Sequence, residues 1–259
     1  MKTEANHPHP PSHSGWAPPS PASGRGVLSI DAAILAGGLG TRIKGVLGNC
    51  PKVLAPVGER IFLDILLDHL LRAGIGRAVL CLGHLAEKVI EHLAAAPPPL
   101  AVEMVIEDEP LGTAGALRLA RPWLNSNPVL VLNGDSWTDA DLAAFANAHS
   151  ASGAMASLLC VEVPDCGRYG RVEVGIDGRL VRYVEKDPDF HGPGAISAGI
   201  YLFSQGLLEE LMRRPGPSLE RDILQQLPPG QVHAFIAKGA RFIDIGTPES
   251  LKEAKEVIT

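Results

Sequence analysis

Cysteine and long hydrophobic runs are both scarce in this 259-residue sequence. Its four cysteines show no C-x-x-C spacing, which argues against a zinc site or a disulfide framework and favours reduced thiols. No apolar stretch approaches the roughly 20 residues of a membrane-spanning helix. The N-terminus also lacks the hydrophobic segment of a signal peptide. These absences predict a cytoplasmic protein with no membrane partner.

Positive charge is in deficit as well. Lys and Arg total 23 against 29 Asp and Glu, which gives a formal net charge of −6. This balance argues against a general affinity for nucleic acid. A phosphate-binding site must therefore arise from a local concentration of basic residues.

The first 26 residues differ in composition from the rest of the chain. They contain six prolines and a single aromatic residue, Trp16. Such a segment buries too little apolar surface to offset its ordering entropy, so we expect a disordered, Pro-rich tail over residues 1–26. Residues 27–259 are expected to form a single domain with a first half, 27–150, and a second half, 151–259.

Apolar runs alternate with segments of helical period throughout the first half, which is the rhythm of βαβ units. The expected strands are 30–35, 78–82, 101–106 and 129–132. The expected helices are 61–73, 85–95, 113–120 and 142–149. This pattern predicts an α/β fold, with a Rossmann-like, mostly parallel sheet flanked by helices on both faces.

The pattern changes in the second half, where strands predominate and predict a mixed sheet. Asp177-Gly178 is a hairpin signal between two of them. Ser218 is placed to cap a helix over 219–227, and Thr247-Pro248-Glu249 is typical of the start of a final helix. We expect the last two strands, 232–236 and 241–245, to pair with each other. The other expected strands are 156–163, 171–174, 180–184 and 195–203.

The first strand leads into a glycine-rich loop, Leu35-Ala36-Gly37-Gly38-Leu39-Gly40-Thr41-Arg42, which Pro51-Lys52 follow. Glycines let backbone N–H groups approach an anion closely, and an arginine and a lysine add charge. The loop is not a P-loop, because Val46 stands where the lysine should be. It is not a dinucleotide fingerprint either, because Ile43 occupies the third glycine position.

The run LAGGLGTR with a downstream PK resembles the sugar-1-phosphate nucleotidylyltransferase family. Further segments resemble that family in the right order, and together they cover residues 29 to about 255. These segments are EDEPLGTAG at 107–115, NGD at 133–135, YGR at 169–171, EK at 185–186, AGIYLF at 198–203 and IDIGTP at 243–248.

The resemblance implies a fold of the nucleotide-diphospho-sugar transferase type, a nucleotide-binding first half and a sugar-binding second half. It also implies transfer of a nucleotidyl group from a nucleoside triphosphate to a sugar-1-phosphate, with release of pyrophosphate. Arg42, Lys52 and Asp135 are the implied catalytic residues, and Asp135 and Asp244 are the implied ligands of Mg²⁺. By contrast, Asp139 and Asp141 are expected to be helix caps.

The resemblance also implies two sets of binding residues. The nucleotide-binding set is Leu35, Ala36, Gly37, Gly38, Gly40, Thr41, Arg42, Glu107, Glu109, Gly112, Thr113 and Ala114. The sugar-phosphate-binding set is Asn133, Gly170, Glu185, Lys186 and Gly199.

The segment at 107–115 is similar to that of guanylyltransferases. A carboxylate accepts hydrogen bonds from the N1–H and exocyclic amine of guanine, and either Glu107 or Glu109 is a candidate for this role. We therefore favour GTP over UTP. The departure from the mannose-type sequence after Arg42 and the FIDIGTPES segment look most similar to D-glycero-α-D-manno-heptose 1-phosphate guanylyltransferases, which serve bacterial surface-glycan synthesis.

Two alternatives stay open at this point. An N-acetylmuramate-1-phosphate uridylyltransferase has a similar length and motif order, and other hexose-1-phosphates are possible acceptors. A non-catalytic nucleotide-sensing module of the same fold would bind GTP without releasing pyrophosphate. Whichever of these functions holds, we expect a homodimer.

Overall fold

The computed structural model describes residues 28–167, 169–184, 189 and 191–258. The expected tail over 1–26 and two of the expected sugar-site residues, Glu185 and Lys186, lie outside the described residues.

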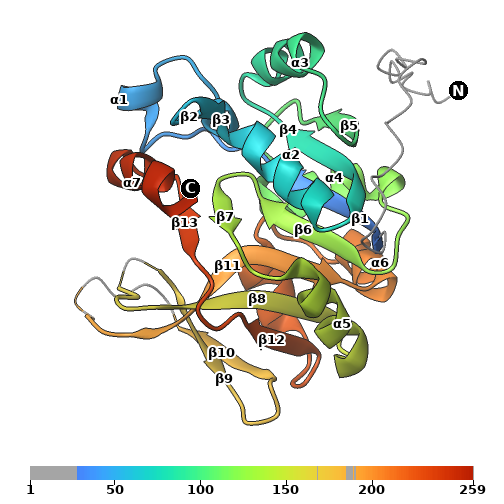
Figure 1. Cartoon of the computed structure of the whole chain (residues 1–259). Coiled ribbons are helices and arrows are strands. Elements are labelled where there is room, and N and C mark those ends of the chain that lie inside the picture. The colour runs from blue at the N-terminus through green and yellow to red at the C-terminus, as the bar shows by residue number, and fades with distance from the viewer. Residues whose placement is uncertain (1–27, 168, 185–188, 190, 259) are drawn as a thin grey trace, which may run out of the picture.

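A nine-stranded sheet forms the centre of the molecule (Figure 1). Its main path runs in the order β10-β9-β11-β6-β1-β4-β5, with β8 beside β11 and β12 beside β8. The predicted parallel core is confirmed, because β1 pairs in parallel with both β4 and β6, and β4 pairs in parallel with β5. These four strands are β1 (Leu28–Leu35), β4 (Ile75–Leu82), β5 (Ala101–Ile106) and β6 (Val129–Asn133).

The remaining strands of the sheet make it mixed, as predicted for the second half. β11 pairs antiparallel with β6 and with β8, β9 and β10 form a hairpin, and β12 runs parallel to β8. The hairpin extends away from the body of the molecule in Figure 1. The bounds are β8 (Ala156–Val163), β9 (Arg171–Val174), β10 (Leu180–Val184), β11 (Gly194–Phe203) and β12 (Val232–Ile236).

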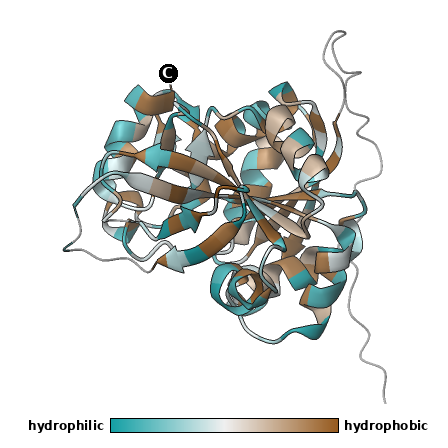
Figure 2. Cartoon of the chain, turned by 90° about the horizontal axis from the view of Figure 1, so that it is seen from below, coloured by the Kyte–Doolittle hydropathy of each residue, from teal (hydrophilic) through white to brown (hydrophobic). Residues whose placement is uncertain are grey.

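Helices cover both faces of the sheet, because successive strand residues point to opposite sides. Along β1, Ala32 and Ile34 join one hydrophobic cluster and Ala33 joins the other. The first cluster includes buried residues of α2 (Phe62–Arg72), α3 (Ala86–Ala95) and α5 (Leu142–Ser152). The second includes those of α4 (Gly112–Ala120) and α6 (Gln205–Arg213). Figure 2 shows the resulting concentration of apolar residues along the central strands.

Small elements complete the fold at one end of the sheet. The final helix is α7 (Pro248–Ile258). Thr247 caps its N-terminus, because the Thr247 hydroxyl accepts a hydrogen bond from Ser250 N at 3.2 Å. Of the helices that the structure describes, none is long and apolar enough to span a bilayer. The other small elements are α1 (Lys44–Leu47), β2 (Pro56–Val57), β3 (Arg60–Ile61), β7 (Ser136–Thr138) and β13 (Phe242–Asp244).

The helix expected over 219–227 is present, but it is not a regular α-helix. The chain instead forms a π turn, Leu219–Ile223, followed by a 3₁₀ turn, Leu224–Gln226. Leu219, Ile223 and Leu224 are all buried, and the wider π turn brings residues at this spacing to one side. Ser218 caps the turn as expected, because its side chain accepts a hydrogen bond from Arg221 N.

Two other expectations need correction, and one helix was not expected. The strands at 232–236 and 241–245 do not pair with each other: β12 joins β8, whereas β13 pairs with β7 in a separate two-stranded sheet. The helix α6, capped by Ser204, was not predicted. Asp141 caps α5 as expected, but Asp139 instead accepts hydrogen bonds from the backbone N and Nε of Arg241, both at 2.7 Å.

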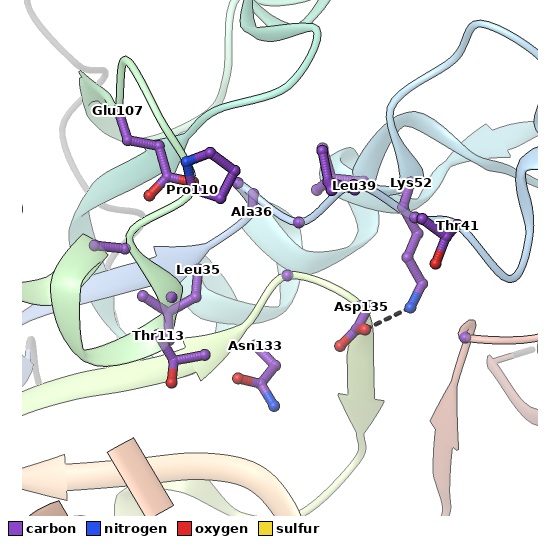
Figure 3. A pocket seen from close by; sticks show the side chains of 18 of the residues that line it. Leu35, Ala36, Leu39, Thr41, Lys52, Glu107, Pro110, Thr113, Asn133 and Asp135 are labelled. Atoms are coloured by element: carbon purple, nitrogen blue, oxygen red, sulfur yellow. Dashed lines mark hydrogen bonds and ion pairs between the residues drawn. The ribbon is translucent and has the colours of Figure 1, made fainter. Parts of the chain in front are cut away.

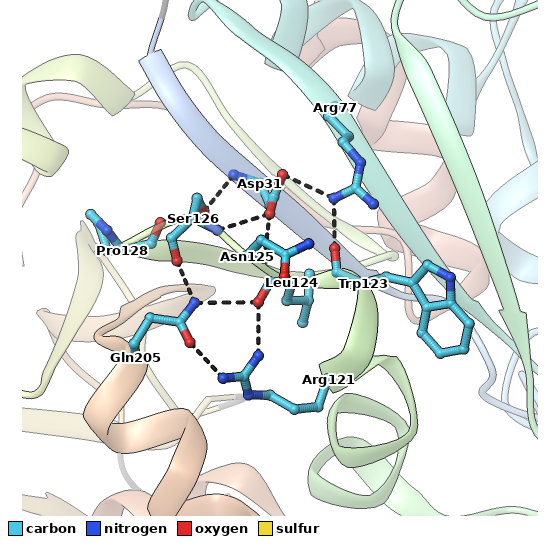
Figure 4. A network of polar contacts seen from close by, with 9 residues as sticks. All are labelled: Asp31, Arg77, Arg121, Trp123, Leu124, Asn125, Ser126, Pro128 and Gln205. Atoms are coloured by element: carbon cyan, nitrogen blue, oxygen red, sulfur yellow. Dashed lines mark hydrogen bonds and ion pairs between the residues drawn. The ribbon is translucent and has the colours of Figure 1, made fainter.

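A polar network ties the beginning of β1 to its neighbours, at the opposite end of the strand from the glycine loop (Figure 4). Asp31 accepts hydrogen bonds from Arg77 Nη1 at 3.0 Å, Asn125 N at 2.7 Å and Ser126 N at 3.0 Å. Gln205 joins the same loop through Ser126 O. This network positions the loop that precedes β6 and therefore the strand that leads to Asn133 and Asp135.

Candidate active site

The glycine loop and the Asn133–Asp135 turn lie side by side because they follow adjacent parallel strands. Gly134 N donates to Leu35 O at 2.8 Å, and Ala36 N donates to Cys81 O at 2.9 Å. Ligands in open α/β sheets bind at the carboxyl ends of the strands. A first cavity of about 460 Å³ opens there, and its wall includes the glycine loop, Lys52, Glu107 and Asp135.

One end of this first cavity is formed by Glu107 and Pro110 (Figure 3). A Cβ at Gly37 would lie 2.5 Å from Glu107 Oε1, so only glycine leaves room for the carboxylate at this point. Glu107 Oε2 accepts a hydrogen bond from Leu111 N at 3.3 Å. Burial raises the pKa of Glu107, partly offset by that backbone hydrogen bond. Of the two candidate glutamates, Glu107 lines the cavity, whereas Glu109 is exposed and does not.

The other end of the first cavity carries Lys52 and Asp135 (Figure 3). Lys52 Nζ donates to Asp135 Oδ2 at 2.5 Å. Arg42 also lines this cavity and is exposed. The carboxylate of Asp135 therefore already faces one positive charge, and two cationic side chains stand where an anionic ligand would enter.

Asp135 and Asp244, far apart in the sequence, are brought together by the pairing of β7 with β13. Asp244 lies opposite Ser136 in that pair, and Ile245 N donates to Asp135 O at 2.9 Å. A Cβ at Gly246 would lie 2.6 Å from Asp244 Oδ1 and 3.4 Å from Lys52 Nζ. The lysine ammonium thus lies close to both aspartates.

These two carboxylates fit Mg²⁺, which prefers hard oxygen ligands and usually keeps several waters. The position of the Lys52 ammonium shows that a cation is accommodated beside them. Within the described ranges no group of three or more His, Cys, Asp or Glu side chains is placed to hold a metal. A metal held here would therefore complete its coordination with water or phosphate oxygens.

A second cavity, of about 910 Å³, adjoins the first and lies toward the second half of the chain. Asn133, Gly170 and Gly199, which were predicted to bind the sugar phosphate, line it. Glu185 and Lys186 lie outside the described residues. Five residues line both cavities, namely Arg42, Lys52, Asn133, Asp135 and Gly246.

Most of the predicted nucleotide-binding residues line the first cavity. Besides Glu109, the exception is Ala114, whose backbone N–H donates to Pro217 O at 2.8 Å and whose side chain is fully buried in the core. Residues of the expected set that line the first cavity are Leu35, Ala36, Gly37, Gly38, Gly40, Thr41, Arg42, Glu107, Gly112 and Thr113.

Several polar and aromatic residues of the second cavity were not singled out from the sequence. Tyr169 lies in the YGR motif and Tyr201 in AGIYLF, and Ser218 was expected only as a helix cap. The others follow no motif, because loops and strand ends bring them together. These residues are Tyr169, Tyr183, His191, Ser197, Tyr201, Ser218, Glu220, Arg221 and Gln225.

Comparisons with known proteins find similar sequences among guanylyltransferases. The D-glycero-alpha-D-manno-heptose 1-phosphate guanylyltransferase of Aneurinibacillus thermoaerophilus is 30% identical over 228 residues, covering 88% of this chain and 97% of that protein. The protein of the same name from Campylobacter jejuni is 31% identical over 220 residues, covering 85% and 96%.

A solved structure also matches. The crystal structure of HddC from Yersinia pseudotuberculosis has a TM-score of 0.79 and 33% identity to this chain, covering 89% of this chain and 100% of that one. A second crystal structure of HddC is complexed with GMP-PN. The expected fold class, of the nucleotide-diphospho-sugar transferase type, is confirmed. Because residues 31–259 match the sequence profile described as Nucleotidyl transferase, the chain belongs to the nucleotidyl transferase family.

Proposed function

We propose that this protein transfers a guanylyl group from GTP to D-glycero-α-D-manno-heptose 1-phosphate and releases pyrophosphate, in the synthesis of bacterial surface glycans. One observation carries the proposal: two cavities meet at a shared wall of Arg42, Lys52, Asn133, Asp135 and Gly246. A transferase that joins two phosphorylated substrates needs two such compartments with its cationic side chains between them.

The reaction is an in-line attack of a sugar-phosphate oxygen on the α-phosphorus of the triphosphate, from which pyrophosphate leaves. The attacking phosphate is already a nucleophile, so no general base is required. The barrier is chiefly electrostatic, because two polyanions must meet. Positioning and neutralisation of charge therefore account for most of the expected catalysis.

The chain's own residues supply these effects at the wall between the cavities. Backbone N–H groups of Gly38 to Thr41 hold the β- and γ-phosphates, assisted by the Arg42 guanidinium. Lys52, released from Asp135, contacts phosphate oxygens near the α-phosphorus. Asp135 and Asp244 would hold Mg²⁺, which supplies positive charge to the phosphates when bound.

Guanine is the base that the first cavity suits best. The Glu107 carboxylate accepts from the N1–H and exocyclic amine of guanine, a pair of donors that uracil lacks. The relatives named above are guanylyltransferases, and HddC has been crystallised with GMP-PN. We therefore retain GTP as the nucleotide and treat UTP as the alternative to be tested.

The sugar is inferred from the same relatives, whose names specify heptose 1-phosphate. N-Acetylmuramate 1-phosphate remains the alternative acceptor, and a nucleotide-sensing module the alternative of another class. A cytoplasmic location and a homodimer remain predictions.

Pyrophosphate release tests the function directly. The assay combines each of GTP, UTP, TTP and CTP with each of heptose, mannose, glucose and N-acetylmuramate 1-phosphate, in the presence of Mg²⁺. We expect release with GTP and heptose 1-phosphate. Turnover with UTP and N-acetylmuramate 1-phosphate but none with GTP would overturn the heptose assignment, and GTP binding without release from any pair would favour the sensing module.

Asp135→Asn tests the metal assignment. The amide lacks the charge that holds Mg²⁺, so we expect turnover to fall at least about 100-fold, the scale of one removed electrostatic contact to the transition state. Asp68→Asn is the matched control, because the partly exposed Asp68 side chain pairs with Arg60 and does not line the site. Full Mg²⁺-dependent activity in Asp135→Asn would contradict the assignment.

A further inference from the structure

The second cavity is lined by a tyrosine, Tyr183, whose hydroxyl finds no hydrogen-bond partner within the described part of the chain. Tyr183, on β10, lines the cavity, and its hydroxyl is shielded from solvent and unpaired among the residues that the structure describes. Buried polar groups in folded proteins are nearly always paired, and an exception calls for an explanation such as an absent ligand. No hydrogen bond with a described residue would have to break for this hydroxyl to bind a ligand in the cavity.

The neighbours of Tyr183 form a polar group with spare capacity. Tyr201 donates its hydroxyl to Glu220 Oε1 at 2.5 Å. Among the described residues, the other oxygen, Oε2, has a single long contact, 3.5 Å from Ser218 Oγ. A carboxylate accepts about four hydrogen bonds, so Glu220 retains unused acceptor positions toward the cavity that it lines.

The tyrosine hydroxyls stay protonated and available as donors. Burial, followed by the nearby Glu220 carboxylate, raises the pKa of Tyr183 well above its usual range. The same two causes, in the same order, raise the pKa of Tyr201. Tyr183 therefore remains a neutral phenol that donates one hydrogen bond and accepts others.

The fold places this group away from the phosphate-binding wall. Tyr183 lies on the β9–β10 hairpin, Tyr201 on β11 and Glu220 in the π turn, and all three line the second cavity but not the first. The cationic residues Arg42 and Lys52 line both cavities. A sugar-1-phosphate with its phosphate at the shared wall would have its ring in the cavity that Tyr183 and Glu220 line.

We propose that Tyr183 and Glu220 form a specificity subsite that recognises a hydroxyl group of the sugar-1-phosphate at the end remote from its phosphate. The sugar hydroxyl accepts from Tyr183 and donates to Glu220. The fixed negative charge of Glu220 selects neutral polyhydroxy sugars and repels a sugar that carries a carboxylate at this end. The inference rests on the proposed function and defines the substrate class of the same site.

Tyr183→Phe is the first test, because it removes the hydroxyl and keeps the ring. We expect kcat/KM for heptose 1-phosphate to fall about 10- to 100-fold, with KM for GTP unchanged. The melting temperature should stay the same or rise, since an unpaired buried hydroxyl is lost. A higher melting temperature with unchanged kcat/KM would show that the hydroxyl serves no substrate, and would overturn the proposal.

Glu220→Gln is the second test and does not depend on the first variant. The amide keeps the volume but removes the charge, so we expect the ratio of kcat/KM for heptose 1-phosphate to that for N-acetylmuramate 1-phosphate to fall. Glu173→Gln is the matched control, because Glu173 pairs with Arg182 on the exposed hairpin. An unchanged ratio in Glu220→Gln would contradict the charge selection.

The wild-type protein separates this inference from the function on which it rests. Turnover of the wild type with no change of sugar preference in either variant refutes the subsite and leaves the proposed function standing. If the wild type releases no pyrophosphate with any sugar-1-phosphate, the proposed function fails and the subsite fails with it.

Discussion

At the residue scale, the candidate site depends on charges that are already paired or partly buried. Lys52 Nζ lies 2.5 Å from Asp135 Oδ2. This ion pair would have to separate when a metal binds Asp135 and a triphosphate binds Lys52. Glu107 is held by Leu111 N at 3.3 Å beside Gly37, where a Cβ would clash with the carboxylate. Glu107 therefore has a defined position before a substrate arrives, whereas Lys52 and Asp135 must separate when the substrates bind.

Glu107→Gln tests base recognition. Glutamine presents one carbonyl oxygen and one amide NH₂ group, so it cannot accept hydrogen bonds from both donors of guanine as a carboxylate does. We expect kcat/KM for GTP to fall about 10- to 100-fold, with smaller losses for UTP and CTP. Glu109→Gln is the control because Glu109 is exposed outside the cavity. Equal losses for all triphosphates would indicate a role in stability instead.

The wild type adds a pH dependence to this test. Because burial raises the pKa of Glu107, its carboxylate is protonated at a higher pH than that of an ordinary glutamate. The preference for GTP over UTP should therefore decline as the pH falls through this raised pKa, and Glu107→Gln should remove the decline.

At the scale of elements, a buried polar contact joins three of them. His149 on α5 has Nδ1 2.8 Å from Ser157 Oγ on β8, and that hydroxyl lies 3.5 Å from Nδ1 of His233 on β12. Burial, followed by the influence of His233, lowers the pKa of His149 to about 4. The neutral imidazole thus helps to hold α5 against the second half of the sheet.

This contact predicts acid sensitivity of the fold. The unfolded chain binds a proton at His149 near pH 6.5, whereas the folded chain resists it until about pH 4. The contribution of His149 to the unfolding free energy is therefore complete above about pH 6.5. It is lost as the pH falls toward 4, and the loss amounts to about 3 kcal/mol. Urea unfolding between pH 7 and pH 4 measures it.

His149→Gln isolates this contribution. It should flatten the decline of unfolding free energy over that pH range, whereas His84→Gln should not, because His84 is exposed. Identical slopes in wild type and His149→Gln would mean that other groups, such as carboxylates, cause the acid sensitivity.

At the scale of the whole molecule, a third hydrophobic cluster joins parts of the first half of the chain to its final strand and helix. It contains Phe62 of α2, Trp137 of β7, Ile243 of β13, Ile245, and Ala254 of α7. This packing holds β13 beside β7 and thereby brings Asp244 to Asp135. The geometry of the proposed metal site therefore depends on the docking of the final helix.

Ile245→Ala tests this dependence. Ile245 is fully buried, so its truncation should reduce the unfolding free energy by about 2–5 kcal/mol and also raise the Mg²⁺ concentration needed for half-maximal turnover. Leu211→Ala, in the fully buried face of α6, should cause a similar loss of stability without changing the Mg²⁺ requirement. An equal effect of both variants on the Mg²⁺ requirement would refute the coupling.

The strands, helices and loops that depend on neighbouring residues were predictable from the amino-acid sequence. Apolar runs and helical periods predicted the four parallel strands and the helices between them, because burial on one face imposes a period. The glycine loop with Arg42 and Lys52 was also predicted, since backbone access to an anion requires glycines at defined positions. The structure places these residues in the wall of the first cavity.

Features that depend on contacts distant in sequence needed the folded structure. It separated β12 from β13, gave the helix over 219–227 a π turn in place of a regular α-helical one, and distinguished Glu107 from Glu109 at the first cavity. It also gathered Tyr183, Tyr201 and Glu220 from three elements. No local spacing encodes such a group, because strand partners and buried polar neighbours are chosen by the packing of the whole chain.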